Sequence, residues 1–104
     1  MNVPAVGIDV GSTNVKAVRV DEAGRLAASA ERPLATRRDG DVVEQDAEAV
    51  WDAVRTIVAE VADGSVGTIG VCSQYSSIVP VDAHGEFRTA FVAAGVAGAS
   101  LAVM

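Results

Sequence analysis

A short polar turn near the start of the chain carries the residues best suited to chemistry. Residues 9–14 read Asp-Val-Gly-Ser-Thr-Asn. Gly11 has no Cβ and permits the close approach of a triphosphate, to which the amides and hydroxyls of Ser12 and Thr13 can donate. A carboxylate this close to phosphates needs a divalent cation between them, so we expect Asp9 to be a direct or water-mediated Mg²⁺ ligand.

Lys16 adds a positive charge two residues beyond this turn. The spacing G-x-x-x-x-G-K-[ST] of a Walker loop does not occur in the chain. Because the Asp-x-Gly-Ser-Thr motif is short, the residues alone also fit an ordinary hairpin with a polar turn.

The first third of the chain has the hydropathy pattern of an antiparallel meander. Residues 4–10 form an apolar run and residues 15–20 alternate, which predicts two strands joined by the polar turn. Residues 25–32 predict a third strand that stops before Pro33, since proline cannot donate to a ladder. Residues 34–45 are rich in turn formers and are interpreted as a loop.

A helix is predicted from Asp46, its N-cap, to about residue 62. One continuous apolar stripe supports it: Val50, Val54, Ile57, Val58 and Val61. The apolar residues 66–72 then predict a strand that is buried on both faces and parallel to a meander strand, because a helix precedes it. Residues 78–81 predict one more strand. The fold class is therefore α/β.

Composition limits the chain to one domain and argues against several partners. It has 104 residues, a net charge of −6 and one cysteine. The only adjacent basic pair is Arg37-Arg38, which disfavours a nucleic-acid partner. The lone cysteine and an N-terminus without a basic region predict a cytoplasmic protein with no signal peptide.

Residues 89–104 contain no charge and are rich in Ala, Gly and Val. Sixteen residues are fewer than the roughly twenty that span a bilayer. We therefore expect either a helix packed on the core or a disordered tail, and no membrane contact. The domain interpretation is one domain over residues 1–88 and an apolar tail over residues 89–104.

Three sequence blocks together resemble the amino-terminal part of the FGGY family of carbohydrate kinases. They read GIDVGSTNVKAVRVDEAGRLAAS, VVEQDAEAVWDAV and TIGVCSQYSSIVPVDAHGE, and they occur in the family's order over residues 4–86. The resemblance implies a ribonuclease-H-like lobe of the actin-like ATPase fold. Such a lobe is one of two between which ATP and a sugar or polyol bind.

The resemblance also assigns roles to residues of the first turn. It makes Asp9 a Mg²⁺-associated carboxylate and places Lys16 where many members have a basic residue facing the nucleotide. The turn itself is the family's phosphate cradle and comprises Gly11, Ser12, Thr13 and Asn14.

The family reaches the sugar hydroxyls from the segment that aligns with residues 73–77, which implies substrate contacts by Gln74, Tyr75 and Ser76. Here the chain differs from the Gln-Met-His-Gly of xylulose kinases and from the Asn-Gln-Arg-Glu-Thr of glycerol kinases. The resemblance therefore does not assign either xylulose or glycerol as the substrate of this chain. The alternative is that Gln74 is a loop residue and Tyr75 an aromatic lid on the core.

Several other conspicuous residues are given structural roles. Residues 44–46 are interpreted as a loop anchor followed by the helix cap. Trp51 is expected in the core or as a partial lid, and Cys72 is expected to pack at the end of a buried strand.

Beyond residue 86 the family's Trp-x-Asp-x-Arg segment is missing, as are the second lobe and its Asp general base. We therefore expect a truncated or frame-shifted fragment of a sugar or polyol kinase that is inactive alone and carries no catalytic base. Two alternatives stay open. One is that the chain pairs with a separately encoded second lobe, and the other is that it is a noncatalytic nucleotide-binding domain of the actin-like superfamily.

Overall fold

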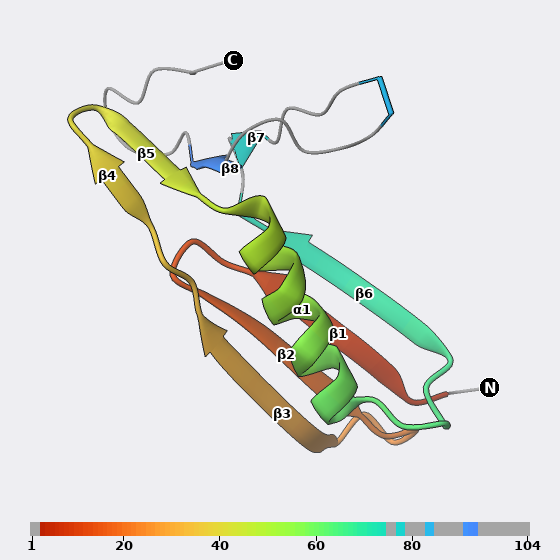
Figure 1. Ribbon diagram of the computed structural model, residues 1–104. Coiled ribbons are helices and arrows are strands. Elements are labelled where there is room, and N and C mark those ends of the chain that lie inside the picture. Colours follow the sequence, from red (N-terminus) through yellow and green to blue (C-terminus); the bar gives the residue numbers. More distant parts are fainter. Residues whose placement is uncertain (1–2, 75–76, 79–82, 85–90, 94–104) are drawn as a thin grey trace.

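The predicted meander forms three strands of a four-stranded sheet (Figure 1). The computed structural model describes residues 3–74, 77–78, 83–84 and 91–93. Strands β1 (Ala5–Val10), β2 (Asn14–Val20) and β3 (Leu26–Pro33) pair antiparallel, and β6 (Thr68–Ser73) pairs parallel with β1. The strand order is β3-β2-β1-β6, so the predicted meander and the parallel fourth strand are confirmed.

Helix α1 (Ala47–Val61) lies across one face of this sheet (Figure 1). Its N-cap is Asp46, as predicted, and the Asp46 carboxylate accepts a hydrogen bond of 3.0 Å from the amide of Glu48. The predicted extent of the helix is therefore confirmed to within a residue.

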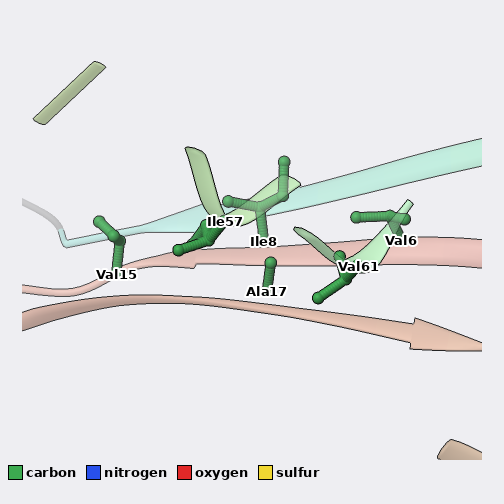
Figure 2. Close-up of a cluster of buried hydrophobic side chains, with 6 residues drawn as sticks. All are labelled: Val6, Ile8, Val15, Ala17, Ile57 and Val61. Atoms are coloured by element: carbon green, nitrogen blue, oxygen red, sulfur yellow. The ribbon is translucent and has the colours of Figure 1, made fainter. Parts of the chain in front are cut away.

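The core forms where the apolar stripe of α1 meets the alternating apolar residues of β1 and β2. Its fully packed side chains point into one layer between helix and sheet (Figure 2) and are Val6, Ile8, Val15, Ala17, Ile57 and Val61. Trp51, in contrast, is 56% exposed, so its expected place in the core is wrong. It follows Val50 by one residue, a rotation of about 100° that carries it off the stripe.

Strand β6 is exposed along its whole length, which contradicts the expected burial on both faces. Ile69 is 57% and Val71 67% exposed, and Cys72 is exposed as well. The physical reason is the position of α1, which packs mainly on β2 and β3 and leaves the outer strand uncovered. An apolar run predicts a strand but does not identify the element that packs against it.

The predicted loop at residues 34–45 contains a hairpin instead. Strand β4 (Arg37–Asp39) pairs antiparallel with β5 (Val42–Gln45) across a two-residue connection. Gly40 adopts the left-handed conformation there, with φ of 59°. Glycine at the first position of a two-residue connection is typical of a hairpin turn, so the interpretation of these residues as a loop was wrong.

A second sheet has the order β4-β5-β8-β7 and uses two short strands, β7 (Ser77–Ile78) and β8 (Phe91–Ala93). The strand predicted at residues 78–81 is thus seen only at its first residue, and residues 79–82 lie outside the described part. Of the predicted tail, residues 91–93 form β8 and the rest also lies outside it. No helix among the described residues is long and apolar enough to cross a membrane.

The C-terminal end of α1 is tied to the sheet by Arg19. Its Nε donates a hydrogen bond of 2.6 Å to the carbonyl of Val61, and its Nη1 lies 3.2 Å from Oδ2 of Asp63. Hydrogen bonds from Ser65, with a smaller contribution from Arg19, hold the pKa of Asp63 below its usual value. A cation at this end also complements the helix dipole, so β2 caps the helix that covers it.

We predict that Arg19→Met lowers the free energy of unfolding by about 1–2 kcal/mol, because a half-buried hydrogen bond from a charged donor is lost. Urea denaturation of the 104-residue chain measures this. Arg25→Met is the matched control, since Arg25 pairs with Asp21 at the surface and such pairs contribute roughly 0–1 kcal/mol. Equal destabilisation by the two variants would contradict the capping role.

Candidate functional site

Two parallel strands end side by side at one edge of the main sheet. The polar turn follows β1, and Gln74 follows β6. The backbone amide of Gln74 donates a hydrogen bond of 2.8 Å to the carbonyl of Val10, which carries the pairing one step past β6. Ligands of α/β sheets bind outside the carboxyl ends of parallel strands. This edge is therefore the natural place for a binding site.

The turn between β1 and β2 is closed by a hydrogen bond of 3.0 Å from the Gly11 amide to the Asn14 carbonyl. A Cβ at Gly11 would lie 2.8 Å from that carbonyl oxygen, closer than Cβ atoms tolerate. Glycine is therefore required here by the turn itself. The sequence analysis instead explained the glycine at this position by the close approach of a phosphate.

The carbonyls of the turn are directed toward the protein. The Thr13 carbonyl accepts a hydrogen bond of 2.8 Å from the Leu34 amide, and the Ser12 carbonyl accepts one of 2.7 Å from Nε2 of Gln45. Both residues are exposed, and their own amides donate to no acceptor in the described part of the chain. A turn with bonded carbonyls and available amides suits an anion.

Gln45, the last residue of β5, lies at the centre of a buried polar cluster. It is 2% exposed. Besides the Ser12 carbonyl, its Nε2 donates to Oγ1 of Thr36 at 3.1 Å, and its Oε1 accepts from Nε2 of Gln74 at 3.2 Å. The anchoring role predicted for residues 44–46 is confirmed. The contact between Gln45 and Gln74 could not be predicted from the sequence, because it depends on how two distant segments meet.

Asp9 projects from the sheet face opposite α1, next to a shallow hollow. The strand register places it beside Lys16 of β2 and Cys72 of β6. The hollow has a volume of about 490 Å³. Its lining is mostly apolar, with Asp9 and Lys16 as the charged residues, and comprises Gly7, Ile8, Asp9, Lys16, Val18, Gly70, Val71 and Cys72. The carboxylate of Asp9 is thus open to a ligand.

The charges on this face are partly paired. Nζ of Lys16 lies 3.4 Å from Oε2 of Glu31 on the neighbouring strand. Partial desolvation raises the pKa of the Cys72 thiol, and the adjacent Asp9 carboxylate raises it further. Both effects favour the protonated thiol of Cys72. Cys72 is exposed and contacts Asp9, so its expected role in packing is wrong.

The surroundings of Asp9 fit a cation shared with a ligand. No group of three or more His, Cys, Asp or Glu residues within the described ranges could enclose a metal ion. Mg²⁺ is commonly held by one or two carboxylates together with phosphate oxygens and waters. A single accessible carboxylate near a turn with available amides is compatible with that donor set.

The structure thus brings together most of the predicted site residues. Gly11, Ser12 and Thr13 form the turn, and Asn14 begins β2 directly after it. Asp9 and Lys16 lie on the adjoining sheet face and Gln74 at the same sheet edge. The predicted substrate residues Tyr75 and Ser76 lie outside the described residues.

Comparison with solved structures finds sugar kinases. The chain is similar to a gluconate kinase from Lactobacillus acidophilus, with 26% identity and a TM-score of 0.79 over 88% of this chain and 20% of that one. It is similar to a xylulose kinase from the same organism, with 27% identity and a TM-score of 0.78 over 86% and 19% of the two chains. Plasmodium falciparum glycerol kinase with ADP shares the fold at 14% identity, with a TM-score of 0.75 over 88% and 20%.

The chain therefore spans about a fifth of the length of these kinases. A comparison with curated proteins finds no match. The sequence model of the FGGY family of carbohydrate kinases, N-terminal domain, matches residues 4–92. Since that match covers most of the 104 residues, the chain belongs to the FGGY family of carbohydrate kinases.

Proposed function

We propose that this chain is the phosphate-binding part of an ATP-dependent carbohydrate kinase, which transfers a phosphoryl group from ATP to a sugar or polyol hydroxyl. The observation that carries the proposal is the turn after β1. The carbonyls of Ser12 and Thr13 are bonded into the protein, while the amides of the same two residues are available to an anion. Phosphoryl transfer depends mostly on positioning and on stabilising charge, which is what such a turn supplies.

Each residue of the turn and of the adjoining sheet face is assigned a role that follows from its position. The Ser12 and Thr13 amides and hydroxyls bind phosphate oxygens, and Gly11 lets the turn close. Asp9 would hold Mg²⁺, which neutralises phosphate charge when it is bound. Lys16 adds a positive charge on the same sheet face, where it forms an ion pair with Glu31.

The sugar site is assigned to the segment that follows β6. Gln74 lies next to the phosphate turn through its bonds to Val10 and Gln45, so a hydroxyl bound there would be near the phosphates. Tyr75 and Ser76 continue this segment. No general base is assigned to this chain, and a second lobe, as part of the same protein or as a partner, would supply it.

We predict that Gly11→Ala weakens binding of Mg·ADP roughly tenfold, because the added Cβ would force the Asn14 carbonyl away and open the turn. Isothermal titration calorimetry on the 104-residue chain measures the affinity. Gly64→Ala is the control, since a Cβ there meets no described atom within 4 Å. Unchanged affinity in a folded Gly11→Ala protein would contradict the phosphate-binding role of the turn.

Asp9→Asn is expected to remove most of the strengthening that Mg²⁺ gives to ADP binding, a loss of at least about tenfold, because a neutral amide is a poor Mg²⁺ ligand. The measurement is an ADP titration with Mg²⁺ and with EDTA. Asp41→Asn makes the same charge change at the exposed connection of the β4–β5 hairpin and should leave the Mg²⁺ effect intact. If Mg²⁺ strengthens binding equally in wild type and Asp9→Asn, Asp9 is not its ligand.

The 104-residue chain is expected to show no ATP-dependent phosphorylation of a panel of pentoses, hexoses and polyols, because none of its residues is assigned as the base. A coupled assay of ADP release tests this, and turnover above the no-sugar control would refute it. Binding of any sugar in the same panel, followed by amide chemical shifts of Gln74, separates a kinase lobe from a nucleotide-binding domain without a sugar site.

A further inference from the structure

Gln45 satisfies all of its side-chain hydrogen-bonding groups with three separate segments of the chain. One amide hydrogen goes to the Ser12 carbonyl at 2.7 Å and the other to Thr36 at 3.1 Å. The oxygen accepts from Gln74 at 3.2 Å. A primary amide has two donors and one oxygen, so each is used. At 2% exposure, a change to any of them leaves a buried polar group without its partner.

The bond to Ser12 also fixes the direction of a different group. The Ser12 carbonyl and the Thr13 amide belong to the same peptide plane, and the chain contains no cis peptide bond among the described residues. In a trans peptide the C=O and N–H bonds point in opposite directions. When Gln45 holds the Ser12 oxygen toward the protein, the Thr13 N–H is therefore turned away from it.

We propose that Gln45 is a positioning residue that aims the Thr13 amide at a bound phosphate and links the phosphate turn to the sugar-binding Gln74. This role rests on the proposed function. Gln45 touches neither ligand, because it is buried and acts through the Ser12 carbonyl on one side and the Gln74 side chain on the other. It lies 33 residues from Ser12 and 29 from Gln74 along the chain.

The test compares Gln45→Met with Glu44→Gln. Methionine has nearly the length of glutamine and no amide, so it removes the three hydrogen bonds with little change in volume. Glu44 is the preceding residue of β5, is also buried and pairs with Arg37 instead of the turn. Thr36→Val is a milder third variant, which removes only the second acceptor of Gln45 at an exposed position and so keeps the test usable if Gln45→Met does not fold.

The first measurement uses the ligand-free chain. In ¹H–¹⁵N spectra, Gln45→Met should move the Thr13 backbone amide and the Gln74 side-chain amide, and Glu44→Gln should leave both in place. The second uses inorganic tripolyphosphate with Mg²⁺. Its affinity should fall roughly tenfold in Gln45→Met and about threefold in Thr36→Val, with the same factors for Mg·ADP. Equal losses for the two ligands localise the effect to the phosphates.

A separate measurement tests whether Gln45 links the turn to Gln74, in the segment after β6. Tripolyphosphate with Mg²⁺ should shift the Gln74 side-chain amide in wild type and not in Gln45→Met. The proposal would be overturned if the amide chemical shifts of Thr13 and Gln74 did not change in Gln45→Met, or if the folded variant bound tripolyphosphate as tightly as wild type. If wild type binds neither tripolyphosphate nor ADP, the proposed function fails by itself. The ligand-free Thr13 shift then still decides whether Gln45 sets the turn.

Discussion

The planarity of the peptide bond is the constraint on which the site depends. A turn presents its amides to an anion only if the carbonyls of the same peptide planes are held elsewhere. Here the Gly11 and Leu34 amides bind the carbonyls of Asn14 and Thr13, and the Gln45 side chain binds the Ser12 carbonyl, whose peptide plane carries the available Thr13 amide. These donors come from the turn itself, from the segment after β3 and from β5. The conformation of the turn at residues 11–14 therefore depends on distant segments of the chain, although its motif is only a few residues long.

The same dependence explains what the sequence could and could not predict about the fold. Periodicity and capping located β1, β2, β3, α1 and β6 because those signals are local. The parallel pairing of β6 followed from the helix that precedes it. The exposure of Ile69 and Val71 could not be foreseen, since burial is decided by which element covers a strand, and α1 covers β2 and β3.

At the site, residue types were predictable and their connections were not. Asp9 and Gly11 have chemistry that can be recognised from the sequence, although Gly11 is needed first for the contact with the Asn14 carbonyl. Gln45 was expected to anchor a loop, and that much is correct. Its link to Gln74 joins residues 29 positions apart and exists only because β5 and the end of β6 meet at the same sheet edge.

The net charge of the chain affects how a polyphosphate can approach the turn. The chain carries a net charge of −6, and Lys16, the cation on the Asp9 face, is paired with Glu31. A polyphosphate would approach against this field, since a negative protein repels anions over roughly a Debye length of 10 Å. Peptide dipoles at the turn offset only a fraction of a charge each. Under the proposed function, oriented amides alone would therefore be insufficient for tight nucleotide binding, and a cation at Asp9 would supply the missing positive charge.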